Sequence, residues 1–158
     1  MQKTIATPQT TDELLMLCEN IAGLNLAELA EIANIKMAKN LLTNKGWVGQ
    51  LIEWHLGATA GSKPEQDFKH LGIELKTIPI DQNGKVLETT FVCSTPLMNT
   101  TQLNWENSNI CNKLSKVLWV PVQGERNIPL AERVVGSGFL WQADHSQEQL
   151  LKNDWNEL

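Results

Sequence analysis

The sequence lacks the features that would place the chain in a membrane or in an oxidising compartment. No apolar run approaches the length of a membrane span, and residues 1–4 carry no apolar signal-peptide core. The three cysteines, Cys18, Cys93 and Cys111, are widely separated and form no C-x-x-C pair. Isolated cysteines in odd number fit reduced thiols rather than a disulfide framework or a zinc site. We therefore expect a cytoplasmic location.

The sequence also has little positive charge. Thirteen Lys and Arg stand against 18 Asp and Glu, and the net charge of −5 argues against constitutive binding to nucleic acid. The lysines are concentrated, however, because residues 36–85 hold seven of them against five acids, three of which are Glu53, Asp67 and Glu74. If those three acids held a metal ion, this middle segment would become the positive face of the protein.

The length of the chain and its apolar periodicity predict a single domain over residues 1–158. Helices are expected within residues 10–56: one after a capping-box pattern at Thr10 and Glu13, one from Asn25, and one over 47–56. A sheet region is expected over 64–142, followed by a terminal helix over 146–158 that Ser146 would cap. Strands are predicted at 72–79, 87–93, 117–122, 133–135 and 139–141, with a hairpin turn at 81–84.

These elements indicate an α/β fold with a mixed β-sheet flanked by helices. Pro121 predicts that its strand ends there or lies at an edge, since proline cannot donate to a sheet ladder. Residues 25–33 look like the first helix of a helix-turn-helix, but residues 37–42 are too short for a recognition helix. The glycine-rich segment 57–63 is not a phosphate loop, because only three residues separate its glycines and Ser62 precedes Lys63.

The most informative pattern is Asp67, six residues, then Glu74-Leu75-Lys76. On an extended strand Glu74 and Lys76 point to one face, and Leu75 points to the other. If Asp67 folds back toward Glu74, two carboxylates can hold Mg²⁺, which prefers hard oxygen ligands. The metal ion would activate a water molecule and stabilise charge on a phosphate, while Lys76 would orient the nucleophile. The same spacing also describes a solvated strand face, so the pattern alone leaves both interpretations open.

Longer stretches of the sequence resemble the MutH family of DNA mismatch repair endonucleases, relatives of the restriction enzymes with a PD…(D/E)xK site. The resemblance runs from about Thr10 to the last residue. It rests on the stretches 45–49, 56–68, 71–77, 87–92, 117–122 and 154–155.

The resemblance implies a restriction-endonuclease-like fold and a site made by Asp67, Glu74 and Lys76. It also implies a metal-site glutamate on the helix over 47–56, which is Glu53, and a lysine near the DNA and the active site, which is Lys113. The cofactor would be Mg²⁺, which Mn²⁺ could replace. Further contacts to DNA are expected from Lys45, Lys63, Glu88 and Thr89.

The partners that the resemblance implies are double-stranded DNA with unmethylated or hemimethylated GATC sites and the activator MutL. The enzyme would nick the unmethylated strand and would be a monomer when complete. The family normally continues for several tens of residues with the arm that reads the GATC bases, so we expect this chain to be C-terminally truncated. A continuing helix with an exposed apolar stripe at Leu151, Trp155 and Leu158 would then favour self-association.

Two departures from the family pattern remove positive charge. Residues 109–112 are not basic, and Thr43 and Asn44 replace an Arg-Asp pair before Lys45. We therefore expect weak, salt-dependent binding to DNA with little preference for GATC. Two other functions stay open: a GATC restriction endonuclease that cuts both strands, and a binding remnant that keeps the fold without turnover.

Overall fold

The computed structural model describes residues 5–44, 46–95 and 103–157. Three helices form the N-terminal part: α1 (Thr11–Ile21), α2 (Leu26–Ala33) and α3 (Trp47–Leu56), as the periodicity predicts. The Thr10 side chain caps α1 by accepting a hydrogen bond from the Glu13 backbone N–H. The Glu13 carboxylate accepts from the backbone N–H of Gln9 and not from that of Thr10, so the predicted capping box is incomplete. Asn25 and Glu28 form the complete box on α2. The reciprocal bonds at the start of α2 satisfy donors that a helix N-terminus otherwise leaves free.

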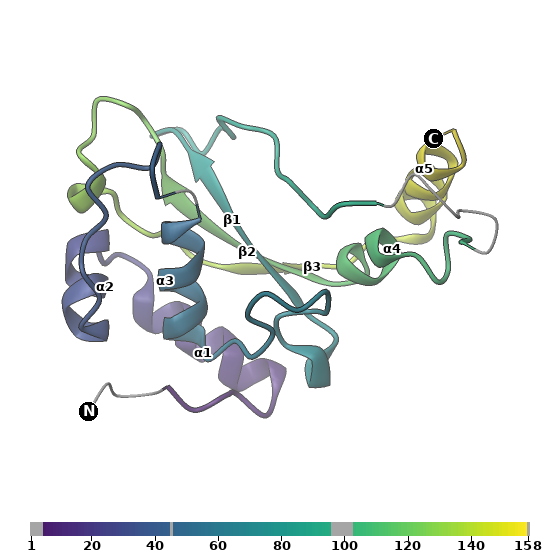
Figure 1. Cartoon of the computed structure of the whole chain (residues 1–158), viewed down its shortest axis with the longest axis horizontal. Coiled ribbons are helices and arrows are strands. Elements are labelled where there is room, and N and C mark those ends of the chain that lie inside the picture. The colour runs from purple at the N-terminus through teal and green to yellow at the C-terminus, as the bar shows by residue number, and fades with distance from the viewer. Residues whose placement is uncertain (1–4, 45, 96–102, 158) are drawn as a thin grey trace.

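The sheet has the order β1-β2-β3, with strands β1 (Glu74–Ile80), β2 (Val117–Gln123) and β3 (Phe139–Trp141). β1 pairs with β2 in parallel, with Glu74 opposite Val117, and β2 pairs with β3 antiparallel. The predicted mixed sheet flanked by helices is confirmed (Figure 1). Two short 3-10 helices, η1 (Lys69–Leu71) and η3 (Leu130–Glu132), lie in the connections.

One hydrophobic core joins α1, α2 and α3 to the inner face of the sheet. Its fully buried members include Leu14, Leu29, Ile52, Phe68 and Leu118. α3 contacts β1 directly and also packs on α1 and α2. The core therefore fixes α3, which carries Glu53, against the strand that carries Glu74 and Lys76.

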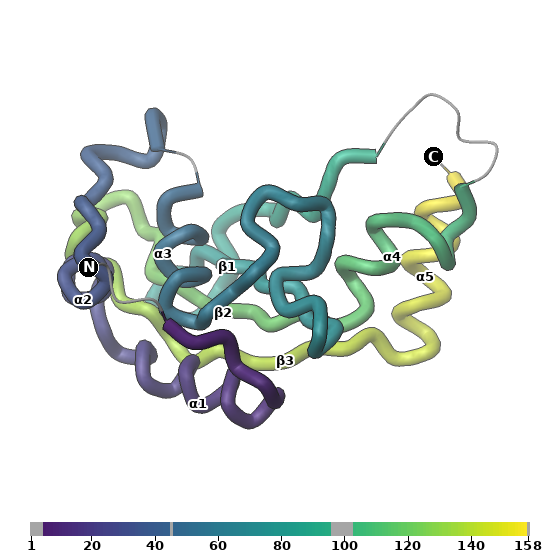
Figure 2. The backbone as a smooth tube through the Cα atoms, turned by 60° about the horizontal axis from the view of Figure 1, so that its bottom comes forward, coloured from purple at the N-terminus to yellow at the C-terminus, as the bar shows by residue number. Residues whose placement is uncertain are grey.

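Helices α4 (Asn109–Leu114) and α5 (His145–Asn156) lie together at the end of the molecule away from α2 (Figure 2). The N-cap of α5 is Asp144, not Ser146 as predicted, because Asp144 and Gln147 form a capping box. The stripe expected to be exposed is half-buried at Leu151 and Trp155, while Leu158 lies outside the described residues. Leu151 lines a small cavity of about 210 Å³ together with Trp105 and Leu114.

Two predicted strands are wrong. The turn at 81–84 forms as expected, but residues 87–93 do not return as a strand, and the chain pairs only through a bridge between Ile80 and Val86. Residues 133–135 likewise make only isolated bridges, at Val134 and Val135. The edge of β1 that residues 87–93 were expected to occupy therefore carries no continuous ladder in the described residues.

Pro121 neither ends a strand nor lies on an edge strand, since β2 is central and continues to Gln123. The pairing of β2 around Pro121 explains why the prediction is wrong. β3 pairs with β2 only at residues 117–119, and the next partner on that side is the bridge from Val122 to Val135. Pro121 lies in the gap between them, where its carbonyl oxygen accepts from the Gly136 backbone N–H at 2.8 Å. A proline is tolerated there because the ladder is already interrupted.

Residues 37–42 form no helix, which agrees with the rejection of a helix-turn-helix. Among the described residues no helix has both the length and the apolar character needed to cross a membrane.

Candidate active site

Strand β1 places an acid and a lysine side by side. Glu74 is only 2% exposed, and Lys76 Nζ lies 3.3 Å from Glu74 Oε1. Leu75, between them, belongs to the hydrophobic core. This is the alternation predicted from the two-residue period of a strand. A solvated strand face is excluded for this segment, because Glu74 is buried.

Asp67 folds back onto the same strand, as predicted. The Leu75 backbone N–H donates to Asp67 Oδ2 at 2.9 Å. The fold-back is made by a tight turn in which Phe68 and Ile73 exchange two backbone hydrogen bonds around η1. Gly72 closes that turn at φ +68, a left-handed conformation that glycine adopts without steric cost. The six-residue spacing between the two acids is thus the length of this turn.

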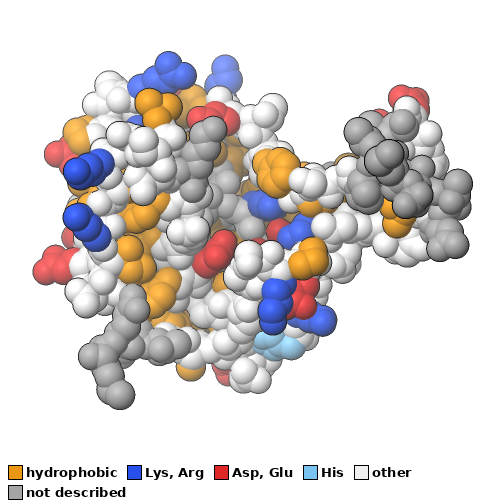
Figure 3. All heavy atoms as spheres, in the orientation of Figure 1, with side chains coloured by type: hydrophobic (Ala, Val, Ile, Leu, Met, Phe, Trp, Pro, Cys, Tyr) orange, Lys and Arg blue, Asp and Glu red, His pale blue; other side chains and the backbone are white. Residues whose placement is uncertain are grey.

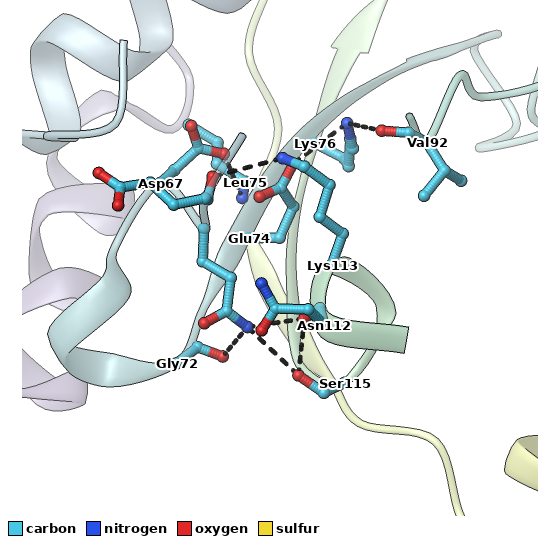
Figure 4. A network of polar contacts seen from close by, with 11 residues as sticks. Asp67, Gly72, Glu74, Leu75, Lys76, Val92, Asn112, Lys113 and Ser115 are labelled. Atoms are coloured by element: carbon cyan, nitrogen blue, oxygen red, sulfur yellow. Dashed lines mark hydrogen bonds and ion pairs between the residues drawn. The ribbon is translucent and has the colours of Figure 1, made fainter. Parts of the chain in front are cut away.

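Lys113, in the last turn of α4, completes the polar cluster from the other side. Its Nζ lies 2.9 Å from Glu74 Oε1 and also donates to the Glu65 backbone carbonyl at 3.4 Å. Lys76 donates in turn to the Val92 carbonyl at 3.2 Å. Figure 4 shows Asp67, Glu74, Lys76 and Lys113 converging from β1, the preceding loop and α4. Four of the five side chains expected at the site, those of Asp67, Glu74, Lys76 and Lys113, therefore lie together.

The two oxygens of Glu74 have different surroundings. Oε1 lies next to both lysine ammonium groups, whereas Oε2 is buried and has no hydrogen-bond partner among the described residues. Leaving a buried carboxylate oxygen unpaired is costly. A free carboxylate oxygen is the kind of ligand that a hard divalent cation prefers.

The pKa of Asp67 is also shifted by its surroundings. Burial raises its pKa above the ordinary aspartate value, and the nearby charge of Glu74 raises it further. The bond from Leu75 and the charges of Lys113 and Lys76 oppose that shift without cancelling it. A cation bound between the two acids would remove the repulsion.

Glu53 lies close enough to join this charge cluster electrostatically. Its pKa is raised to about 7, chiefly by burial and then by the charges of Asp67 and Glu74. Within the described residues, however, no three Asp, Glu, His or Cys side chains converge into a compact metal-binding group. Glu53 is therefore an acid that faces the site from α3, beyond the tighter arrangement of Asp67 and Glu74.

The end of α3 is fixed by Gly57, at φ +70. A Cβ atom at this position would lie 2.7 Å from the carbonyl oxygen of Ala6, so any larger residue would displace the N-terminal segment. The absence of a Cβ atom at Gly57 thus lets the N-terminal segment pass close to the end of α3.

The residues predicted to contact DNA are less closely grouped. Lys63, Glu88 and Thr89 are exposed, on the loop before Asp67 and on the segment after the turn at 81–84. Lys45 lies outside the described residues. Figure 3 shows basic and acidic side chains meeting in a hollow on this face of the molecule, between the main body and the α4–α5 end. An open hollow of about 500 Å³ borders α4 and is lined mainly by polar residues, among them Ser94, Ser108 and Asn112.

Three further contacts in the cluster could not be predicted from residue spacing. The Val92 carbonyl and the Leu75 N–H are main-chain groups, which leave no pattern in side-chain spacing. Gln66 directly precedes Asp67 and is buried with its amide bonded to three groups. In the sequence, a glutamine beside Asp67 carries no signature that distinguishes it from a surface glutamine.

Comparison with known proteins identifies a family whose model covers these residues. The family model for the DNA mismatch repair enzyme MutH matches residues 56–154, which include Asp67, Glu74, Lys76 and Lys113. Curated proteins named DNA mismatch repair protein MutH are similar over nearly the whole chain. Those of Vibrio parahaemolyticus and Vibrio campbellii are 60% and 62% identical over 96% of this chain and 67% of their own length. That of Shewanella oneidensis is 56% identical over 99% of this chain and 70% of its own.

This chain spans about two thirds of the length of those relatives. The mixed sheet and its flanking helices agree with the restriction-endonuclease-like fold that the resemblance implied. The matched region contains both acids and both lysines of the cluster. The chain belongs to the family of the DNA mismatch repair enzyme MutH.

Proposed function

We propose that this chain carries the catalytic centre of a metal-dependent DNA endonuclease of mismatch repair, which nicks the unmethylated strand at GATC sites. The observation that carries the proposal is the state of Glu74. One of its oxygens lies next to two lysines, the other is buried without a partner among the described residues, and the charge of Glu74 raises the pKa of Asp67. Most buried polar atoms in native proteins have a hydrogen-bond partner, and a cation held by the two carboxylates would supply one for this oxygen.

Asp67 and Glu74 would hold the metal ion, with Glu53 supporting it from α3. We propose Mg²⁺, with Mn²⁺ able to substitute, because all candidate donors are carboxylate oxygens. When bound, the ion would lower the pKa of a water molecule and stabilise the negative charge that develops on the scissile phosphate.

The lysines have separate tasks in this proposal. Lys76 Nζ is held between Glu74 Oε1 and the Val92 carbonyl, so its remaining N–H can orient the attacking water. Lys113 approaches from α4, on the side of the open hollow. Its ammonium group would bind a non-bridging phosphate oxygen and neutralise charge as the P–O bond breaks. Because both ammonium groups share one carboxylate oxygen, they are positioned before DNA arrives.

We propose that double-stranded DNA lies over the hollow on this face. Lys45 and Lys63 would contact the phosphate backbone, and Glu88 and Thr89 would contact DNA from the segment after the 81–84 turn. Recognition of hemimethylated or unmethylated GATC, activation by MutL and a monomeric state belong to the same proposal for the whole protein. The names of the relatives, which specify mismatch repair, support it.

The proposal can be tested with a duplex that holds one GATC site, methylated on a single strand and labelled differently on each strand. The expected result is cleavage of only the unmethylated strand by the whole protein, in the presence of Mg²⁺ and with MutL added in a parallel reaction. Cleavage of both strands would favour a GATC restriction endonuclease. Binding without cleavage under all conditions would favour a remnant that keeps the fold and has lost turnover.

A further inference from the structure

Gln66 ties together the parts of the chain that carry the acids and Lys113. Its side chain is buried, at 7% exposed, immediately before Asp67. The Nε2 atom donates to the carbonyl oxygens of Gly72 at 3.0 Å and Asn112 at 2.8 Å, and it lies 3.2 Å from Ser115 Oγ. Figure 4 shows these bonds meeting between Gly72, Asn112 and Ser115.

The orientation of this amide follows from its partners. Both close neighbours are carbonyl oxygens, which only accept hydrogen bonds, so the group between them must be the amide NH₂ and not the amide oxygen. The Ser115 hydroxyl donates to the same Asn112 carbonyl at 2.9 Å. Asn112 lies near the C-terminal end of α4, where backbone carbonyls have no partner inside the helix. Gln66 thus supplies a bond that a six-residue helix cannot supply for itself.

We propose that Gln66 is a positioning residue for Lys113, acting through the end of α4. Gly72 lies just before β1, and Asn112 directly precedes Lys113. One amide therefore spans the turn before Glu74 and the helix of Lys113, which are far apart in the sequence. This link sets the distance at which Lys113 Nζ meets Glu74 Oε1, 2.9 Å.

The inference rests on the proposed nuclease function for its catalytic consequence, but the positioning itself does not depend on that function. A glutamine that served only to satisfy buried backbone groups would stabilise the fold without a specific effect on Lys113. A positioning glutamine should affect Lys113 and leave Lys76 in place, because Lys76 is held by β1 and the Val92 carbonyl. The two roles can therefore be separated by following the two lysines individually.

The first readout is the ammonium signal of each lysine in the ¹⁵N-labelled full chain, without metal or DNA. In Gln66→Met, which keeps the side-chain volume and removes the amide, we expect the protected Lys113 signal to be lost or broadened and the Lys76 signal to persist. Gln123→Met is the matched control, because Gln123 Oε1 accepts from the Val134 N–H at 2.9 Å at the far end of β2. It should leave both signals unchanged. If Gln66→Met does not fold, as judged by its thermal transition, Gln66→Asn gives the same comparison, because its amide is too short to reach both carbonyls.

The second readout is a double-mutant cycle on nicking rate with Lys113→Ala. Gln66→Met should slow nicking by roughly 10- to 100-fold, the scale of a small misplacement of a catalytic group, and should cost little more in the Lys113→Ala background. The positioning role would be overturned if the Lys113 signal were unchanged in Gln66→Met. It would also be overturned if Gln66→Met slowed nicking as much in the Lys113→Ala background as in the wild type. If the wild-type chain fails to nick DNA, the proposed function fails on its own, and the ammonium signals still decide the role of Gln66.

Discussion

The Nζ atom of Lys113 lies 2.9 Å from Oε1 of Glu74, although 39 residues separate the two in the sequence. The second oxygen of Glu74 is buried and has no partner among the described residues, and the charge of Glu74 raises the pKa of Asp67. A lysine from α4 and a lysine from β1 thus both pair with a single oxygen of this buried acid.

Divalent metal should stabilise the protein through Asp67. We expect Mg²⁺ or Mn²⁺ to raise the melting temperature, by an amount that corresponds to about 2.7 kcal/mol when the metal is at 100 times its Kd. Asp67→Asn should abolish the rise, because the amide carries no negative charge to bind the metal ion. The fold should be kept, because the amide oxygen can still accept from the Leu75 N–H. Differential scanning fluorimetry with and without metal measures this. Asp154→Ala, on the exposed side of α5, is the control, and an equal metal response in Asp67→Asn would contradict the assignment.

Glu53 should make the metal-free protein less stable as the pH rises. Its pKa is about 7 in the folded protein and near the ordinary 4.5 when unfolded, so the folded state binds more protons between those values. The contribution of Glu53 to stability therefore falls as the pH rises from 4.5 to about 7. Glu53→Gln should be more stable than wild type at pH 8 in EDTA, and the difference should disappear toward pH 4.5. Denaturant unfolding at both pH values tests this, and an equal difference at both would show that the Glu53 charge is not responsible.

His55 should make the folded protein less stable as the pH falls, which is the opposite of the effect of Glu53. Burial lowers its pKa, and its Nε2 lies 2.8 Å from the Leu29 carbonyl, which requires an N–H at that nitrogen. The unfolded state therefore binds more protons below the ordinary value of 6.5, and stability is lost as the pH falls below it. His55→Gln, which retains a donor without a titrating ring, should lack this component. NMR titration of the His55 ring would contradict the prediction if its pKa were at or above 6.5.

Much of this site could be predicted because its signals are local. The two-residue period of β1 pairs Glu74 with Lys76, and the apolar spacing of residues 47–56 predicts α3 with its bounds correct. The errors occur where a partner strand decides the outcome. Residues 87–93 and 133–135 have strand-like composition but no continuous neighbour, and Pro121 is tolerated because of a gap in the pairing beside it. The Val92 carbonyl and the amide of Gln66 depend on tertiary contacts that no spacing encodes.

Lys76 should be needed for cleavage and not for metal binding. Lys76→Ala should keep the metal-induced rise in melting temperature, because both acids remain, and should lose about 10² or more in cleavage rate, the usual effect of removing an electrostatic catalytic group. Lys85→Ala is the control, since Lys85 is exposed beyond the 81–84 turn. A Lys76→Ala protein that cleaved at the wild-type rate would exclude this role.

Lys63 should contribute to DNA affinity without contributing to specificity. The chain has a net charge of −5, so we expect weak binding that falls steeply with salt. Lys63→Ala should weaken binding equally on GATC and scrambled duplexes and reduce the salt slope by about 1. Lys152→Ala is the control, because Glu106 already pairs with Lys152. Fluorescence anisotropy at several salt concentrations measures both effects, and a loss confined to the GATC duplex would mean that Lys63 reads bases.

The central claim is that Asp67, Glu74 and Lys76 form a metal-dependent nuclease centre. The most direct measurement is the conversion of supercoiled plasmid with GATC sites to nicked circles by the wild-type chain and by Glu74→Gln, each in Mg²⁺ and in EDTA. Nicking by wild type in Mg²⁺ alone, with a loss of about 10² or more in Glu74→Gln, is the predicted result. Nicking that persists in EDTA, or that Glu74→Gln performs at the wild-type rate, would contradict it.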